Sequence, residues 1–194
     1  RWIRPWSTFR YLESFIGGFS EEYEALGFKL VYRQLLRKPE ILLKMILDRY
    51  KIIHLVRENH LDVRISSLIT RKRGEAHSNE ETDVPVVHLD PSLLVMRLKL
   101  RKNVVRTTRF ILGVLPLSVI EVTYESLCKD TERTLSTVAG FLSVDPYTDY
   151  QSPFKKISAV PDWERIENYE EIRSVLSGTE FEGLLDNKQH DSDQ

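Results

Sequence analysis

The sequence has very little cysteine: Cys128 is the only one in 194 residues. A lone cysteine excludes a disulfide within the chain, and its scarcity favours a reducing compartment, so we expect a cytoplasmic location. Metal-ligand patterns are also missing. The five histidines do not have the spacing of a metal site, and they are His54, His60, His77, His88 and His190. We therefore expect no metal cofactor.

Long apolar runs and an excess of one charge are missing as well. The longest apolar run, Phe110–Ile120, contains Gly113, Pro116 and Ser118, and it is too short to span a bilayer. Lysine and arginine total 28 against 29 acidic residues, a net charge of -1. This balance argues against a nucleic-acid-binding protein. We expect one soluble domain over residues 1–194, long enough to bury a proper core.

A starting methionine is absent too. The chain begins at Arg1, and we expect the natural protein to begin upstream, so that the domain is N-terminally truncated.

Apolar periodicity predicts alternating strands and helices. Short β-rich runs at Phe28–Tyr32 and Lys51–Val56 flank a helix that begins near Pro39, which predicts a parallel strand-helix-strand unit. Asn59 is expected to cap the next helix. The further expected elements are a flexible polar loop at 71–85, a long helix from Asp90-Pro91, a strand at Leu117–Val122, a helix from Asp130 or Thr131, helices at Glu164–Leu176 and Thr179–Leu185, and a polar tail at 186–194.

The long helix has two distinctive stripes. Its predicted apolar stripe consists of Leu93, Met96, Leu100, Val104, Thr107 and Ile111. Its other faces carry Arg97, Lys99, Arg101, Lys102, Arg106 and Arg109, with no acidic residue between them. Such a basic face is usually only solvated, but it could also steer an anionic cofactor or acceptor toward the protein.

The turn after Lys51–Val56 predicts an anion site. Arg57 follows a buried strand and precedes a helix, whose first N–H groups and positive dipole end favour an anion. Its guanidinium adds a fixed positive charge. Ser66, nine residues later, could bond the same anion through its hydroxyl. The competing interpretation pairs Arg57 with Glu58 or Asp62, and makes Ser66 an ordinary helix serine.

Three segments, in order, resemble a known family. Lys51-Ile-Ile-His-Leu-Val-Arg57-Glu-Asn with Ser66 resembles the 3'-phosphate-binding element of sulfotransferases that use 3'-phosphoadenosine 5'-phosphosulfate (PAPS). Val122-Thr-Tyr124-Glu-Ser-Leu127, followed by Thr134-Leu135 and Gly140-Phe-Leu142, looks like their YEDL, TL and FLG segment. Ile166-Glu-Asn168-Tyr-Glu-Glu-Ile172 with Gly178-Thr-Glu-Phe181 is similar to the C-terminal helices of a bacterial-type branch. The resemblance spans roughly residues 27 to 185.

The resemblance implies a fold and a set of cofactor contacts. The fold would be an α/β, P-loop-NTPase-like three-layer sandwich with a central parallel sheet flanked by helices. Arg57 and Ser66 would hold the 3'-phosphate of PAPS, with Ser67 as the near alternative. The family serine commonly lies one residue nearer to the arginine than Ser66 does, so the resemblance leaves the exact register open. Tyr124 would lie near the adenine, and Lys155 and Lys156 would belong to a basic loop that closes on the 3'-phosphate. Sulfuryl transfer to a hydroxyl of a carbohydrate, lipid or small-molecule acceptor would leave the product PAP.

The chain also departs from the family pattern. The family's first strand ends in a basic, Gly-containing phosphate loop, whereas Gly17-Gly18 has no basic residue beside it. No catalytic base is identifiable, since the run from Phe28 to Gln34 has neither His nor Glu, and His54 is more typical of a core histidine. The alternative is a non-catalytic or incomplete module of this fold. Another P-loop nucleotide enzyme, such as a kinase, is disfavoured because the sequence has no G-x-x-x-x-G-K-[ST] motif. An RNA-binding role would depend on Arg71-Lys-Arg73 and the basic helix alone, and the balanced charge argues against it.

Overall fold

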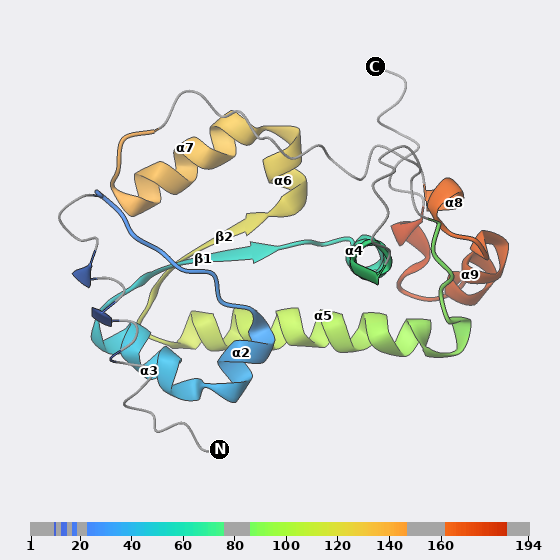
Figure 1. The fold of residues 1–194 in the computed structure, drawn as a ribbon, viewed down its shortest axis with the longest axis horizontal. Coiled ribbons are helices and arrows are strands. Elements are labelled where there is room, and N and C mark those ends of the chain that lie inside the picture. The colour runs from blue at the N-terminus through green and yellow to red at the C-terminus, as the bar shows by residue number, and fades with distance from the viewer. Residues whose placement is uncertain are drawn as a thin grey trace. The chain divides into compact units, whose positions relative to one another are not determined.

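The computed structural model describes residues 10, 13–14, 17–18, 23–75, 86–146 and 162–185. Figure 1 shows their helices and strands. By its internal contacts the chain divides into two compact units. The first comprises Arg1–Val56 and Arg106–Tyr150, and the second comprises Arg57–Val105 and Gln151–Gln194. Within the described residues the protein is mixed α/β, mostly helical, with a small parallel sheet of two strands.

The first unit contains that sheet. Strands β1 (Lys51–Val56) and β2 (Ser118–Thr123) pair in parallel, in a register that runs from Lys51 opposite Ser118 to Val56 opposite Thr123. Helix α7 (Thr131–Leu142) lies on one side of the strands, and α2 (Tyr32–Arg37) and α3 (Pro39–Leu47) lie on the other (Figure 1). Short α6 (Tyr124–Lys129) joins β2 to α7.

Local side-chain chemistry explains where the helices of this unit begin. Pro39 occupies the first turn of α3, where its missing N–H costs nothing. The Thr123 hydroxyl accepts a hydrogen bond from the Ser126 N–H at the start of α6, and the Asp130 carboxylate accepts one from the Arg133 N–H at the start of α7. Helices α3 and α7 confirm the predicted helices that begin near Pro39 and at Asp130 or Thr131.

The second unit has a larger apolar core. It contains α4 (His60–Glu75), the first part of α5 (Pro91–Val114), α8 (Asp162–Arg165), α9 (Tyr169–Leu176) and the 3-10 turn η2 (Glu182–Leu184). Its buried cluster consists of Leu61, Ile65, Ile69, Val87, Leu89, Leu94, Leu98, Ile166, Ile172, Leu176, Phe181 and Leu185. The sequence predicts one apolar face on the Asn59-capped helix, formed by Leu61, Ile65, Leu68 and Ile69. Leu61, Ile65 and Ile69 are fully buried, and Leu68 is partly buried against the same core.

The predicted strand at Phe28–Tyr32 is wrong. Residues 28–31 have no regular secondary structure, and Tyr32 begins α2 instead. Gln34 explains the difference, since its side-chain oxygen accepts a hydrogen bond from the Val31 N–H at 3.0 Å and its own N–H donates to the Val31 carbonyl at 2.8 Å. These two bonds start a helix one residue after Val31. The segment before β1 is therefore helical, not a strand-helix-strand unit.

The predicted helix at Glu164–Leu176 is broken into α8 and α9. Between them Ile166 forms a parallel bridge with Val87, and the Asn168 side chain bonds both the N–H and the carbonyl of Leu89. Backbone groups that bond across to another segment cannot also continue a helix. The second predicted helix, Thr179–Leu185, is reduced to η2.

The predicted apolar stripe of α5 is displaced by one residue. The helix begins at Pro91 as expected, but its buried positions are Leu94, Leu98, Val105 and Leu112, whereas Met96, Leu100 and Val104 are exposed. Both sets recur at helical spacing, so periodicity alone does not choose between them. The predicted loop at 71–85 also begins too early, because α4 continues through Glu75. Residues 76–85 and the tail at 186–194 lie outside the described part of the chain, and the single domain over 1–194 stays a prediction.

Candidate anion-binding site

The predicted pair Arg57 and Ser66 comes together in the second unit. Arg57 directly follows β1 along the chain, and the side-chain oxygen of Asn59 accepts a hydrogen bond from the Asp62 N–H at 2.9 Å, which caps α4. Ser66 lies on α4, and its Oγ accepts a hydrogen bond from Arg57 Nη1 at 3.4 Å. Because successive residues of a helix point about 100° apart, Ser67 lies on a different face. The geometry thus favours Ser66 as the partner of Arg57.

Asp62 lies at the centre of the same cluster. Its Oδ2 accepts a hydrogen bond from Arg57 Nη2 at 2.9 Å, and its Oδ1 accepts one from Arg165 Nη2 at 3.0 Å. The exposed fractions of the side chains are 18% for Arg57, 8% for Asp62 and 0% for Arg165. The ion pair with Asp62 that the competing interpretation foresaw is therefore present. A guanidinium has five N–H donors in a planar fork, so a carboxylate on Nη2 and a hydroxyl on Nη1 can be bonded at once.

Sequence reasoning missed Arg165 and the role of Leu184. Arg165 lies in the polar stretch Asp162-Trp-Glu-Arg, where arginine is normally exposed. The Asn59 amide also donates to the Leu184 carbonyl at 3.0 Å, and this contact spans 125 residues. No local pattern marks contacts of this sequence separation. The apolar Ile166, next to Arg165, was a local sign that this segment enters a core.

The other predicted contacts are placed less completely. Tyr124 begins α6 and is partly buried, directly after the capping residue Thr123. It belongs to the first unit, whereas Arg57 and Ser66 belong to the second. Lys155 and Lys156 lie outside the described residues. The structure therefore brings together one predicted pair, Arg57 and Ser66.

His54 is a satisfied core histidine, as its place inside an apolar strand indicated. It is 6% exposed, and its Nδ1 and Nε2 lie 3.0 Å from Glu121 Oε2 and 2.9 Å from the Tyr32 hydroxyl. The guanidinium of Arg109 forms hydrogen bonds with both oxygens of Glu121. Arg109, with a smaller contribution from His54, lowers the pKa of the Glu121 carboxyl below its ordinary value. The network joins both strands to α2 and α5.

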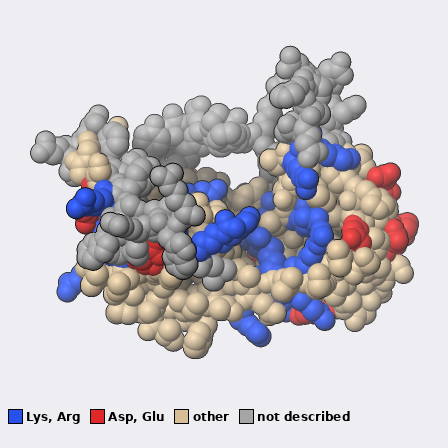
Figure 2. Space-filling model, turned by 60° about the horizontal axis from the view of Figure 1, so that its bottom comes forward, with Lys and Arg blue, Asp and Glu red and all other residues tan. Residues whose placement is uncertain are grey.

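The basic face of α5 is partly neutralised. Besides the pairing of Arg109 with Glu121, Lys102 forms an ion pair with Glu180. Elsewhere in the second unit, burial lowers the pKa of Arg64, and the positive charges of Arg97 and Arg71 lower it further. Figure 2 shows the described Lys and Arg side chains at the surface in blue. Local positive charge thus exists in spite of the balanced total.

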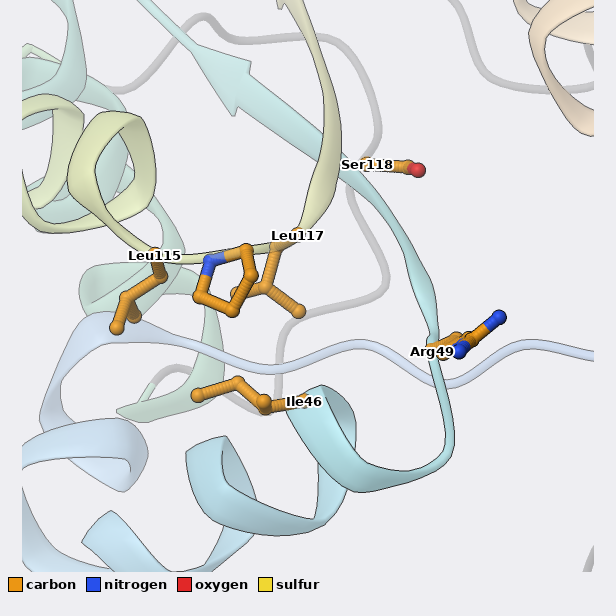
Figure 3. Close-up of a pocket in the computed structure, with 6 residues that line it drawn as sticks. Ile46, Arg49, Leu115, Leu117 and Ser118 are labelled. Atoms are coloured by element: carbon orange, nitrogen blue, oxygen red, sulfur yellow. The ribbon is translucent and has the colours of Figure 1, made fainter.

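A pocket of about 500 Å³ in the first unit is separate from the predicted site residues. It is lined by Ile46, Arg49, Leu115, Pro116, Leu117 and Ser118. In Figure 3 the Arg49 side chain points away from Leu115, so its charge is not directed at the apolar part of the pocket. We assign no predicted site residue to this pocket.

The described residues hold neither a cluster of metal ligands nor a membrane-spanning helix, and the chain matches no known protein in the comparisons. Over the described ranges, no three His, Cys, Asp or Glu side chains gather as metal ligands, and no helix has the length and apolar character needed to cross a membrane. No protein-family model matches the chain, and comparisons with curated proteins and with solved structures return no match either.

Proposed function

We propose that this chain is a sulfotransferase domain that transfers the sulfuryl group of PAPS to a hydroxyl of a carbohydrate, lipid or small-molecule acceptor. The observation that carries the proposal is the contact between Arg57 and Ser66 at the turn from β1 to α4. These are the two residues that the resemblance to sulfotransferases assigns to the 3'-phosphate. The P-loop-like three-layer sandwich, the adenine contact of Tyr124 and the phosphate contacts of Lys155 and Lys156 belong to the same proposal.

The chemistry requires positioning more than covalent participation of the protein. The acceptor oxygen attacks sulfur in line, the bond from sulfur to the 5'-phosphate oxygen breaks, and its electron pair stays on PAP. The proton of the acceptor hydroxyl passes to a base that we do not assign. Arg57 and Ser66 would act at the far end of the cofactor, where binding of the 3'-phosphate fixes the position of the reacting group.

A second candidate is a non-catalytic nucleotide-binding or interaction module of the same fold. Two features favour it: Gly17-Gly18 has no adjacent basic residue for a phosphate loop, and Asp62 already occupies one edge of the Arg57 guanidinium. This candidate predicts binding of PAP without turnover, or no binding at all.

Calorimetric titration with PAP and with AMP tests the proposal, because the two nucleotides differ by the 3'-phosphate. Charge-assisted hydrogen bonds contribute about 1.5–3 kcal/mol, so we expect PAP to bind at least about tenfold more tightly than AMP. Arg57→Ala should abolish the difference and Ser66→Ala should reduce it. Arg106→Ala, which removes the same charge from an exposed position of α5, should preserve it.

Turnover separates the two candidates. Sulfate transfer from PAPS to a hydroxyl acceptor, lost in Arg57→Ala, would support the enzyme. Selective PAP binding with no transfer to a panel of carbohydrate, lipid and phenolic acceptors would favour the non-catalytic module. If PAP and AMP bind equally, or neither binds, the assignment of Arg57 and Ser66 to a 3'-phosphate is wrong.

A further inference from the structure

Two hydrogen bonds connect the C-terminal segment of the second unit, residues 162–185, to the start of α4, next to Arg57. Arg165 bonds Asp62 across 103 residues of sequence, and the Leu184 carbonyl accepts a hydrogen bond from the Asn59 amide across 125 residues. Asn59 in turn caps α4 through the Asp62 N–H. The turn and the first turn of α4 are thus fixed by a segment that is distant in sequence.

Arg165 is well suited to act as a fixed anchor. Its side chain is fully buried, its carbonyl accepts a hydrogen bond from the Val87 N–H at 2.8 Å, and the next residue, Ile166, pairs with Val87 inside the core. A buried side chain has little rotamer freedom, and a buried charge is tolerated only where it is paired. Its guanidinium therefore defines where the Asp62 carboxylate lies.

Asp62 transmits this position to Arg57. One carboxylate oxygen accepts from Arg165 and the other from Arg57, while Arg57 Nη1 points at Ser66. The charges matter as much as the geometry. Asp62 alone would repel an anion bound at Arg57, but the positive charge of Arg165, 3.0 Å from the carboxylate, offsets that repulsion.

We propose that Arg165 is a positioning residue that acts through Asp62, so that the C-terminal segment completes the anion site of Arg57 and Ser66. The ligand in this inference rests on the proposed function. The positioning of Arg57 itself depends only on the contacts among Arg165, Asp62 and Arg57.

The test compares Arg165→Met with Leu176→Ala, a substitution in the same core at a residue that takes part in none of the hydrogen bonds described above. Both should lower the melting temperature. Arg165→Met should also weaken PAP binding by about tenfold, the effect of losing one charge-assisted contact, and leave AMP binding within about twofold. Leu176→Ala should keep the wild-type ratio of PAP to AMP affinity, measured well below its melting temperature.

A second measurement follows Arg57 without any nucleotide. The Nε–H resonance of Arg57, assigned in a ¹⁵N NMR spectrum by its loss in Arg57→Lys, should shift or broaden in Arg165→Met and remain in place in Leu176→Ala. If the wild-type protein does not bind PAP, the proposed function fails, and this resonance alone still decides the positioning of Arg57.

A second substitution of Arg165 keeps the inference testable if the first variant does not fold. Should Arg165→Met not fold, Arg165→Gln keeps a polar side chain but removes the charge, and its amide is two bonds too short to reach Asp62, so the same changes in ratio and resonance are expected. An unchanged affinity ratio together with an unchanged Arg57 resonance, in whichever variant folds, would overturn the inference.

Discussion

Glu121 is a single residue on which three elements of the first unit converge. It accepts hydrogen bonds from Arg109 on α5 and His54 on β1, and His54 in turn contacts Tyr32 on α2. Since Arg109, and less strongly His54, lower the pKa of Glu121 in the folded state, the ionised carboxylate stabilises the fold. That stabilisation is fully present above the ordinary glutamate pKa of 4.5 and is lost as the pH falls through the lower folded value.

We predict that Glu121→Gln lowers the free energy of unfolding near pH 7 and that its difference from the wild type shrinks below about pH 4.5. Urea denaturation at several pH values between 7 and 3 measures this. Glu24→Gln, at an exposed position of the same unit, is the control and should show no such trend. A difference that is constant over the whole range would mean that the Glu121 charge adds nothing to stability.

At the break between α8 and α9, the Asn168 side chain forms hydrogen bonds with both backbone groups of Leu89, as a neighbouring strand would. Its side chain accepts from the Leu89 N–H at 3.1 Å and donates to the Leu89 carbonyl at 2.9 Å. Asn168→Ala leaves both groups of Leu89 without this partner, so we predict a loss of about 1–3 kcal/mol in the free energy of unfolding. Asn103→Ala, at an exposed position of α5, is the control. It should change the free energy of unfolding by less than about 0.5 kcal/mol and should not destabilise the helix, since alanine is the better helix former. Equal effects of the two substitutions would contradict this role for Asn168.

At the scale of the element, α5 offers a matched pair of leucines. Leu98 is 2% exposed and Leu100 is 56% exposed, although the two residues are only two positions apart on one helix. Leu98→Ala creates a cavity, for which we predict a loss of about 2–5 kcal/mol, whereas Leu100→Ala should change stability by less than about 1 kcal/mol. Chemical denaturation of both variants decides which apolar stripe of α5 is buried. A larger loss of stability in Leu100→Ala than in Leu98→Ala would support the apolar stripe predicted from periodicity.

Elements with strong local signals were predictable from the sequence, and elements set by distant contacts were not. Asn59 and Asp130 mark helix starts by accepting hydrogen bonds from N–H groups three residues on, and Pro39 marks one because its missing N–H is tolerated in the first turn. The structure has a helix at each of them. The break near Asn168 depends on Leu89, which is 79 residues away. Periodicity describes one helix at a time, so it carries no information about such a partner.

At the scale of the whole molecule, the candidate site also contains residues that the sequence could predict and one that it could not. Arg57 and Ser66 are nine residues apart on one turn and helix, so sequence reasoning could pair them. Arg165 reaches the same cluster from 103 residues away and was not foreseen. A buried arginine is rare enough that its position follows from the tertiary structure and not from composition.

The two units should differ in local stability. Among the described residues, the buried apolar side chains of the first unit are Ile41, Val56, Leu112, Val122 and Ala139, whereas the second unit has a continuous core that includes the fully buried Leu61, Ile65, Ile69, Ile172 and Leu176. A sheet of two strands with so few buried side chains contributes little on its own. We therefore expect the first unit to open more readily than the second.

Native-state hydrogen exchange measures this directly. Amides of residues 64–69 in α4 and 173–176 in α9 should exchange more slowly than those of 43–47 in α3 and 119–123 in β2, and the gap should narrow as denaturant raises the share of global unfolding. The Leu98→Ala variant, which weakens only the larger core, should bring the two sets closer together in the absence of denaturant. Equal protection of both sets in the wild type would mean that the chain opens as one cooperative unit, which would agree with the single domain expected from its length.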